Sequence, residues 1–595
     1  MRFRAAPLTS IGARDVSSPF YGLDIGVSAL RAAQQLLDTA AHNVANANTP
    51  GYSRQRVSLV ESPPYTFPAF NRSGLPGQIG SGVTVTAITR VRDNFLDLQV
   101  QAQTALQGEW DTRQQQLAKV EAVFPEPSDT GLGSTLSKFW NAWQDVASDP
   151  TSTAARTALT EQASSLAMEM NRDSTQLKMI ASGIDSQVGQ QIQTVNDLAT
   201  QIAALNSQIQ RVTITGDHAN DLMDQREQLL EQLSSIVPAH VMTQQDGSIS
   251  VLVGGTDLVS GVFARKMVAQ TDQATGQTNP VWADGGAVDL PSGQMKALID
   301  VRDTDLAGYL GQLDSLAKGL ADATNTLHER GIDANGAAGQ AIFTYHAGNE
   351  AGTLAVNPTI AADPRLVAAA ASAGTPGDSS VAGLIADLRN ARSYSAGVAG
   401  TDVVGGMDLT TNTTARLMVV SASTATAQTY TFSANGSSLT LTGADGTTQT
   451  VDVADMAANG TQVLNFDQLG VKLTVNAGAA GKAGADLATD LAMTGHNTLV
   501  ATSLFTPSQT ASEYFASFVG KIGSASAQSS EMSKNQQLVV DQLTARVQEV
   551  SGVSLDEEAT DMIRFQHAYQ AAARVITTMD EILDTLINKV GLVGR

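Results

Sequence analysis

The side chains that usually carry acid–base, nucleophilic or metal chemistry are few in this sequence and lie far apart. The chain has 7 histidines and no cysteine, and the two histidines closest in sequence are His328 and His346. Neither the H-E-x-x-H pattern of zinc enzymes nor the G-x-S-x-G pattern of serine hydrolases occurs. We therefore do not expect an enzyme: we expect no catalytic residue, no metal site and no bound cofactor.

One glycine-rich stretch, NAGAAGKAG, has some features of a phosphate-binding loop. Asn476 stands where that loop needs its first glycine, and Ala483 stands where a Ser or Thr would hold the metal ion. Because both defining positions are lost, we interpret the stretch as a flexible edge of a β-rich segment.

The bulk composition narrows the classes of partner. A chain of 595 residues is too long for one hydrophobic core, so several domains are expected. Its net charge of -22 would repel phosphate backbones, and nucleic acid is not an expected partner. No segment offers the roughly 18 uncharged apolar residues of a membrane helix, so we expect no membrane insertion. The first 20 residues lack the apolar core of a cleavable signal peptide, so export would need another route.

Heptad patterns predict a helix at each end of the chain, and these two helices would position any functional residue near them. Near the N-terminus, Leu23, Leu30, Leu37 and Val44 recur at heptad spacing. A narrow apolar seam on a terminal helix needs a second helix, from this chain or from a neighbour. The C-terminal seam consists of Leu555, Met562, Phe565, Tyr569, Ile576, Met579, Leu583, Leu586 and Val590. Ser554 and Glu557 predict a capping box at its start.

Further helices are expected between the ends. The stretch from Pro150 to Pro238 contains no other proline and has its own heptads, which predicts long helices. Helices are also predicted over residues 305–329 and 511–550. We interpret the charged cluster within the stretch from Pro150 to Pro238 as a solvated helix face, with a structural salt-bridge cluster as the first alternative and a catalytic cluster as the second. The cluster is formed by Asp221, Asp224, Arg226 and Glu227.

The β material is internal. Residues 80–91 alternate as a strand does, and residues 240–255 predict a hairpin with Asp246-Gly247 at its turn. Residues 401–495 hold short runs of Val, Thr, Tyr and Phe broken by Asn-Gly and Asp-Gly pairs. These runs indicate a small antiparallel β domain inserted between helices.

Together the patterns predict a mainly α fold, elongated and multi-domain, with inserted β domains. We expect the N- and C-terminal helices to pair as a coiled coil, a helical bundle to follow, and antiparallel β domains to lie outermost. The expected domains are a disordered extension at 1–21, a coiled-coil axial core at 22–60 and 551–595, a helical bundle at 61–240, 301–400 and 500–550, a small β region at 241–300 and an inserted β-rich outer domain at 401–499.

A compact polar motif, HNVANANTPGYSRQRV, ends the first heptad helix. Pro50 bars continuation of the helix and biases Thr49 toward an extended conformation. Gly51 allows a tight turn, and Asn46 and Asn48 can bond free carbonyls at the helix end. We interpret the motif as a mechanical joint between the terminal helix and the rest of the subunit. This joint motif comprises Asn43, Asn46, Asn48, Thr49, Pro50, Gly51, Tyr52, Ser53, Arg54 and Gln55.

These residues also carry a family resemblance. AHNVANANTPGYSRQ resembles the N-terminal signature of the bacterial flagellar axial proteins, the family of rod, hook and hook-associated proteins. VSLDEEATDMIRFQHAYQAAARVITTMDEILDTLI resembles the C-terminal signature of that family, and FWNAWQDVASDPTSTAARTAL, NDLMDQREQLLEQLS and NTLHERGIDANGAAGQAIF follow in its order between the two. Within the family, Ser53-Arg54-Gln55 resembles the hook-associated branch.

The resemblance implies a structural component of the bacterial flagellum that forms the junction ring between hook and filament through its terminal helices. It implies type III export without a cleaved signal and an extracellular location in the flagellum. The implied partners are other copies of the chain, the hook protein, a neighbouring hook-associated protein or flagellin, and a cytoplasmic export chaperone at the C-terminal helix. The insert at 401–499 matches no motif of the family.

Three alternatives remain at this stage. The first is another flagellar axial subunit, from the hook or the rod. The second, from a different class, is a surface adhesin or enzyme that uses the β insert as its active module. The third is a self-associating coiled-coil scaffold in the cytoplasm.

Overall fold

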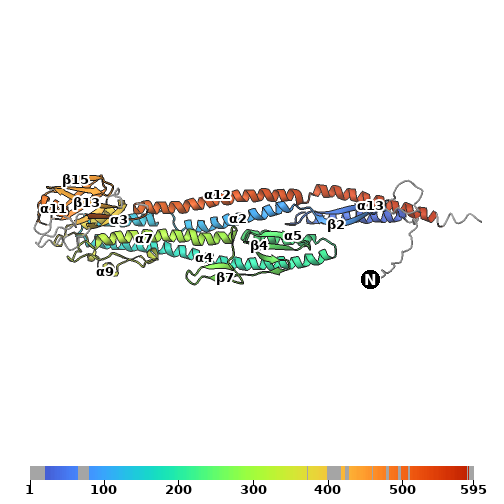
Figure 1. Ribbon diagram of the computed structural model, residues 1–595, viewed down its shortest axis with the longest axis horizontal. Coiled ribbons are helices and arrows are strands. Elements are labelled where there is room, and N and C mark those ends of the chain that lie inside the picture. The colour runs from blue at the N-terminus through green and yellow to red at the C-terminus, as the bar shows by residue number, and fades with distance from the viewer. Residues whose placement is uncertain are drawn as a thin grey trace, which may run out of the picture. The chain divides into compact units, whose positions relative to one another are not determined.

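The computed structural model describes residues 21–63, 80–371, 373–398, 417–421, 428–458, 460–476, 481–492, 498–506, 509–585 and 587. Over these residues the protein is mainly helical with antiparallel sheets between the helices, so the predicted fold class is confirmed (Figure 1). The chain divides into two compact units. The first unit is Met1–Trp110, Val188–Lys296 and Ser533–Arg595, and the second unit is Asp111–Gln187 and Ala297–Met532.

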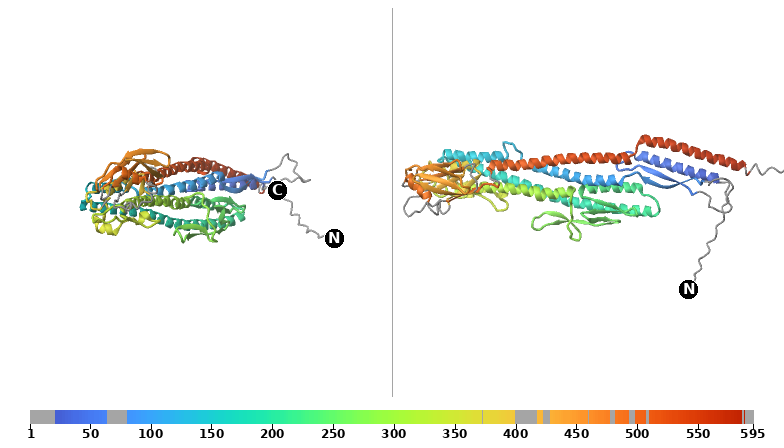
Figure 2. Two further views of the ribbon diagram at one scale, coloured as in Figure 1. Left: turned by 60° about the vertical axis from the view of Figure 1, so that its left-hand side comes forward. Right: turned by 45° about the horizontal axis from the view of Figure 1, so that its top comes forward.

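The terminal helices of the first unit pack side by side, as the heptad patterns predict (Figure 2). They are α1 (Tyr21–Asn46) and α13 (Leu555–Asp584). The approach is close, because a Cβ atom placed on Gly26 would lie 2.9 Å from the Ile576 side chain. The seam positions Leu586 and Val590 and most of the N-terminal extension lie outside the described residues.

The segment after α1 forms a two-stranded antiparallel sheet. Strand β1 (Gln55–Glu61) pairs with β2 (Val83–Arg90), and Gln55 stands opposite Arg90. The strand predicted near residues 80–91 is therefore confirmed. Helix α2 (Asn94–Glu121) begins directly after this sheet.

The proline-free stretch forms the long helix α4 (Thr153–Ile214), as predicted. Its heptad residues Val195, Ile202 and Ile209 are fully buried in the first unit. The helix ends just before Gly216, whose φ of +90° lies in the left-handed region that favours glycine. Helix α5 (Asn220–Ile236) follows and packs against the end of α4.

The predicted hairpin after α5 is also present. It consists of β3 (His240–Thr243) and β4 (Ile249–Val253), with Gly247 at φ +81° in the turn. The strands β5 (Thr256–Ser260) and β6 (Phe263–Ala264) extend it to a four-stranded sheet. A separate hairpin, β7 (Met267–Thr271) with β8 (Thr278–Trp282), leads to α6 (Gln294–Asp300).

The second unit has an aromatic helical core. Helix α3 (Leu132–Ser148) buries Trp140 and Trp143 and packs against α10 (Ser380–Asp387), which also contacts α7 (Ala307–His328). Helix α7 confirms the helix predicted over residues 305–329. A π-helical segment, Val301–Leu306, precedes it and was not predicted.

The inserted β domain belongs to the second unit and has its own hydrophobic core. Its turns at Gly436 and Gly446 have positive φ, as the Asn-Gly and Asp-Gly pairs predict. One sheet has the order β11 (Ser393–Val398), β18 (Thr498–Ser503), β13 (Thr429–Asn435), β14 (Ser438–Gly443) and β15 (Thr448–Asp452). The other has the order β12 (Leu417–Ser421), β17 (Val471–Asn476) and β16 (Thr461–Phe466), and α11 (Gly484–Leu491) packs on β13 and β14. Residues 477–480 of the glycine-rich stretch are not among the described ones.

Helix α12 (Ala511–Ser551) connects this insert back to α13. The remaining short elements are β9 (Phe343–Thr344), α8 (Glu350–Thr353), β10 (Ala355–Val356), α9 (Pro358–Ala362), and the 3₁₀ turns Pro364–Leu366 and Leu388–Asn390. Within the described ranges, every helix is too short or too polar to cross a membrane.

Candidate functional site

The joint motif lies in the first unit, between the end of α1 and the start of β1. Asn46 Nδ2 donates to the His42 carbonyl at 3.1 Å, and Thr49 Oγ1 donates to Asn46 Oδ1 at 3.2 Å. Gly51 has a φ of +76°, so the tight turn requires a residue that tolerates the left-handed region. The side chain of Gln228 on α5 donates to the Pro50 carbonyl next to this glycine. The helix end is therefore closed by its own side chains and covered by α5.

Asn43 is the buried centre of the joint, with 2% of its surface exposed. Its Nδ2 donates to the Gln55 carbonyl at 2.9 Å, and the Gln55 amide donates to its Oδ1 at 2.9 Å. This pair of bonds is the one that a residue of a neighbouring antiparallel strand would make. The Tyr52 hydroxyl also donates to Asn43 Oδ1, at 2.8 Å. The last turn of α1 is thus bonded to β1 through one side chain.

A buried carboxylate ties the same residues to the first turn of α13. Glu558 accepts from Asn43 Nδ2 at 3.1 Å and from Arg54 Nε at 2.7 Å. Ser554 caps α13 as predicted, because its side chain accepts from the Glu557 amide. In a full capping box the Glu557 carboxylate would accept from the Ser554 amide. Here it accepts from Arg54 Nη1 at 2.8 Å and so connects α13 to the joint. Arg54 therefore holds α13 to the joint, and Glu558 connects α13 to Asn43 on α1.

A second buried carboxylate ties the joint to α5. Asp224 accepts from the Ser53 amide at 2.9 Å and from Ser53 Oγ at 2.7 Å. Arg90 Nη1 donates to the same carboxylate at 2.8 Å. Arg92 Nη1 donates to Ser53 Oγ at 3.1 Å. Charge-assisted bonds of this kind are about twice as strong as neutral ones.

The side chain of Gln55 completes the link between β1 and α5. Its Nε2 donates to Asp221 Oδ1 at 2.8 Å, and its Oε1 accepts from Asn220 Nδ2 at 3.2 Å. Asn220 also donates to the Ile88 carbonyl of β2 at 2.8 Å. The first residue of β1 therefore joins α1, β2 and α5 at one point.

The electrostatics of the joint keep its donors protonated. Burial raises the pKa of Tyr52, and the carboxylates of Asp221, Asp224 and Glu558 raise it further. The hydroxyl therefore remains a donor to Asn43. Burial also raises the pKa of Glu227, against the opposing effect of the neighbouring arginines.

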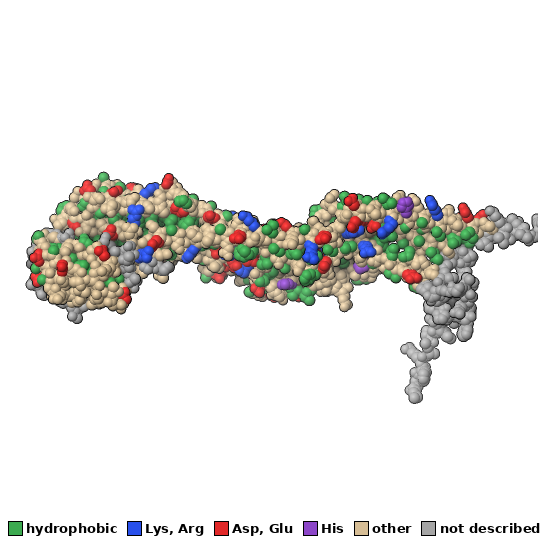
Figure 3. All heavy atoms as spheres, turned by 90° about the horizontal axis from the view of Figure 1, so that it is seen from above, with side chains coloured by type: hydrophobic (Ala, Val, Ile, Leu, Met, Phe, Trp, Pro, Cys, Tyr) green, Lys and Arg blue, Asp and Glu red, His purple; other side chains and the backbone are tan. Residues whose placement is uncertain are grey.

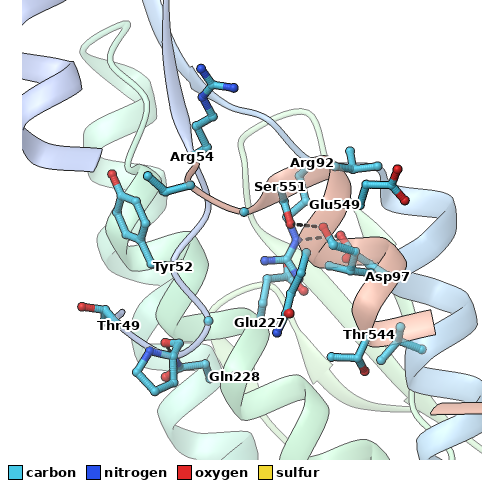
Figure 4. A pocket seen from close by; sticks show the side chains of 18 of the residues that line it. Thr49, Tyr52, Arg54, Arg92, Asp97, Glu227, Gln228, Thr544, Glu549 and Ser551 are labelled. Atoms are coloured by element: carbon cyan, nitrogen blue, oxygen red, sulfur yellow. Dashed lines mark hydrogen bonds and ion pairs between the residues drawn. The ribbon is translucent and has the colours of Figure 1, made fainter. Parts of the chain in front are cut away.

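An open cleft of about 650 Å³ lies beside the joint within the first unit (Figure 4). The turn at Pro50 and Gly51 lines it, together with the segment between α12 and α13. The Arg54 amide of the joint donates to the carbonyl of Ser551, the last residue of α12, at 2.8 Å. Asn48, which also lines the cleft, is exposed and has no hydrogen bond to a described side chain.

The charged cluster in α5 was interpreted wrongly as a solvated face. Asp224 and Arg226 are 5% and 3% exposed, and Arg226 donates to Asn206 Oδ1 at 2.9 Å. Burial lowers the pKa of Arg226 to about 10. The alternative, a structural salt-bridge cluster, is correct for Asp224 and Glu227, which both pair with Arg90. Arg226 is bonded to a neutral partner, and Asp221 is exposed as a solvated face would have it. Their partners lie on distant segments, so no spacing in the sequence could identify them.

The predicted seam is only partly covered within one chain. Leu30 and Leu37 on α1 are half-buried. Val44 and Leu555 are 37% and 52% exposed. On α13, Leu583 is buried, whereas Met562, Phe565, Tyr569, Ile576 and Met579 are half-buried. Figure 3 shows one face of the molecule, on which hydrophobic side chains lie among charged ones at the surface.

The polar side chains of the joint hold α1, α13, β1 and α5 together. Among the residues that the structure describes, no group of three or more His, Asp or Glu could hold a metal ion. The polar groups of the joint are largely engaged with one another, as the bonds above show. What the arrangement can do is fix the direction of α1 and α13 relative to β1 and α5 within the first unit.

Comparison with known protein families agrees with the resemblance in the sequence. The model of the flagellar hook-associated protein FlgK helical domain matches residues 117–343. The flagella basal body rod protein model matches residues 23–52, which include most of the joint motif. The flagellar basal body rod FlgEFG protein C-terminal model matches residues 545–589, which include α13.

Three relatives match the chain over nearly its whole length, and all three are flagellar hook-associated protein 1. The Bacillus subtilis protein is 29% identical over 98% of this chain and 100% of its own. The Escherichia coli protein is 28% identical over 94% of this chain and 98% of its own. The Salmonella typhimurium protein is 27% identical over the same shares. The chain is therefore similar over nearly its whole length to flagellar hook-associated protein 1 of several bacteria, and the joint, the paired terminal helices and the helical domain all lie within segments that match flagellar proteins.

Proposed function

We propose that this chain forms the junction ring between hook and filament in the bacterial flagellum, and that it assembles there through its terminal helices. The observation that carries the proposal is the buried network around Asn43. Two buried carboxylates, Glu558 and Asp224, connect that network to α13 and α5. A subunit with this network presents its terminal helices at one fixed angle before it meets a neighbour.

A fixed angle matters because a closed ring repeats the same contact many times. Any spread in the direction of the terminal helices would accumulate from copy to copy. Each hydrogen bond to a charged group contributes about 1.5–3 kcal/mol, so several of them resist bending of the joint. The joint residues then act as positioning residues for assembly.

The exposed part of the terminal pair supplies surface for neighbouring copies. Val44 and Leu555 of the seam, with Ile563, Val575 and Ile582 beside it on α13, are exposed in the single chain. Burial of one such side chain contributes roughly 1.5–3 kcal/mol. Packing of α1 and α13 against other copies would therefore stabilise the ring.

The partners and location follow from the same proposal. The hook protein on one side, and a neighbouring hook-associated protein or flagellin on the other, are the partners of a junction subunit. The subunit would be exported by the flagellar type III apparatus and held before export by a cytoplasmic chaperone at α13. Its role is structural.

The test is a strain that lacks this chain. We expect bare hooks in electron micrographs and filament subunits released into the medium as monomers. Expression of the full chain from a plasmid should restore filaments. Normal filaments in the strain without the plasmid would contradict the proposal.

Another axial subunit is the second candidate, because the two models that match the terminal segments describe rod proteins. The match over residues 117–343 is to the hook-associated helical domain and argues against it. The same strain separates the two candidates. Loss of a hook or rod subunit would leave no complete hook, whereas loss of a junction subunit would leave hooks intact.

A further inference from the structure

A shallow groove follows one face of α4 within the second unit. Two hollows of about 610 and 520 Å³ share Gln176 and Met179, so they form one continuous depression. Met168 and Met179 are 65% and 60% exposed along it. Leu354 lines the first hollow, and Val123, just after α2, lines the second. Methionine side chains adapt to irregular apolar partners, which makes such a groove suitable for a helix.

The groove has a charge pattern unlike that of the rest of the chain. The chain has 58 acidic and 36 basic residues. The charged side chains that line the two hollows are Lys119 and Arg172, and no carboxylate lines either hollow. Arg172 bonds to Glu169 and Asp173, which belong to α4 but not to the lining. Lys119 instead donates to the neutral Gln116 side chain at 3.0 Å, so its charge is the one that favours an apolar helix face flanked by a carboxylate.

The chain itself carries a helix face of this kind. At the start of α2, in the first unit, Phe95 and Leu98 are 65% and 47% exposed. Ala102 is also exposed, and Leu106 is half-buried. These positions form one stripe, because residues three and four apart share a helix face. Residues 93–111 contain no Lys or Arg, and their carboxylates are Asp93, Asp97, Glu109 and Asp111. Asp93 is exposed and Glu109 and Asp111 are half-buried, whereas Asp97 is buried and bonded to Arg92.

We propose that the α2 stripe of one copy packs into the α4 groove of a second copy. The inference rests on the proposed function, since it names the contact through which copies would meet outside their terminal helices. The lengths agree: Phe95 to Leu106 and Met168 to Met179 each span about 17 Å at the rise of an α-helix. The two surfaces differ, so the contact is head-to-tail. Contacts of that type close into rings or continue as helical assemblies.

Cysteine cross-linking tests the contact directly, because the chain has no cysteine of its own. Cells that lack the native chain would make two variants together, Leu98→Cys and Met179→Cys, each full length. Isolated flagella would be oxidised with copper phenanthroline and run on non-reducing gels. Disulfides need Cα atoms within about 7 Å, so only touching surfaces can be linked. We expect a dimer that joins one copy of each variant, identified by mass spectrometry of the linked peptides.

The matched control replaces Met179→Cys by Met242→Cys. Met242 on β3 is 61% exposed and Met179 is 60% exposed, so cysteines at the two positions are equally accessible to the oxidant. We expect at least ten times more dimer from the Met179→Cys pair than from the control pair. Equal yields, in flagella that contain both variants, would overturn the contact and leave the proposed junction function standing. Flagella that contain neither variant would overturn the junction function, and the contact with it.

Discussion

Replacement of Asn43 by aspartate tests the joint most sharply, because it changes one buried atom from a donor to an acceptor. Asn43 Nδ2 donates to the Gln55 carbonyl and to Glu558 Oε2, the latter at 3.1 Å. In Asn43→Asp both bonds are lost, and a new carboxylate faces the Glu558 carboxylate. At an effective dielectric constant near 20, two unit charges at that separation repel by about 5 kcal/mol.

Proton uptake limits the part of the damage that charge repulsion causes. A protonated carboxyl has one hydrogen to donate where the amide has two, so by binding one proton the variant escapes the repulsion and regains one of the two bonds. Holding an aspartate protonated at pH 7 costs about 4 kcal/mol, and at pH 5 about 1.5 kcal/mol, from its ordinary pKa. The pKa of the new group is raised in the folded state, so the stability of the joint is retained at low pH and is lost as the pH rises toward 7.

Hydrogen exchange measures this loss at the joint itself. The Gln55 amide donates to Asn43 Oδ1, and its exchange rate reports opening of the joint. Relative to the unchanged chain, we expect exchange to be faster by up to about 1,000-fold at pH 7 and about tenfold at pH 5. Equal acceleration of exchange at both pH values, or none at either, would show that carboxylate repulsion at Asn43 does not open the joint.

Asn48→Asp is the matched control, because it adds the same charge nearby at an exposed position. Asn48 has no hydrogen bond to a described side chain, so its replacement should change stability by less than about 0.5 kcal/mol. A comparable acceleration in this control would show that net charge, not the buried network, causes the effect.

Three further predictions concern single residues. Burial, with the charge of Glu169, raises the pKa of Asp173 to about 7, so ionisation of this group destabilises the second unit as the pH rises from about 4 to 7. In urea unfolding at pH 8, the free energy of unfolding of Asp173→Asn should exceed that of the unchanged chain by up to roughly 4 kcal/mol. An unchanged free energy of unfolding there would contradict this. Burial lowers the pKa of His328 to about 4, so the native chain should lose up to roughly 3 kcal/mol as the pH falls from about 6.5 to 4. His328→Gln should abolish that loss in the same unfolding series, and a persistent loss would argue against it. Gly51→Val should abolish swimming while the β insert keeps its exchange protection, because the new Cβ would lie 2.3 Å from Gln228 Nε2 at a φ of +76°; normal swimming would refute the joint.

Local pattern was enough to predict most elements of the fold. The spacing of Val195, Ile202 and Ile209 predicted a long helix, and these residues are buried in α4. The Asp246-Gly247 pair predicted a turn, and Gly247 has the positive φ that such a turn needs. These features depend on residues close together in sequence. The π-helical segment Val301–Leu306 depends on tertiary packing, where the Arg302 side chain is 1% exposed and bonds to Asp185 at 2.7 Å.

The position of the joint could be predicted, but its chemistry could not. Pro50 and Gly51 mark a turn in any context, and the turn is present. The partners of Asn43 and Ser53, however, are Glu558 and Asp224, which are 515 and 171 residues away along the chain. Only folding brings these carboxylates to the motif.

The junction role is tested by locating this chain in an intact flagellum. Gold-labelled antibodies against the β insert would be applied to isolated flagella and viewed by electron microscopy. A junction subunit would give one narrow band of label where the hook meets the filament. Label along the whole hook or the rod would identify another axial subunit, and label on the cell surface alone would identify an adhesin. Either of these two results would contradict the junction role.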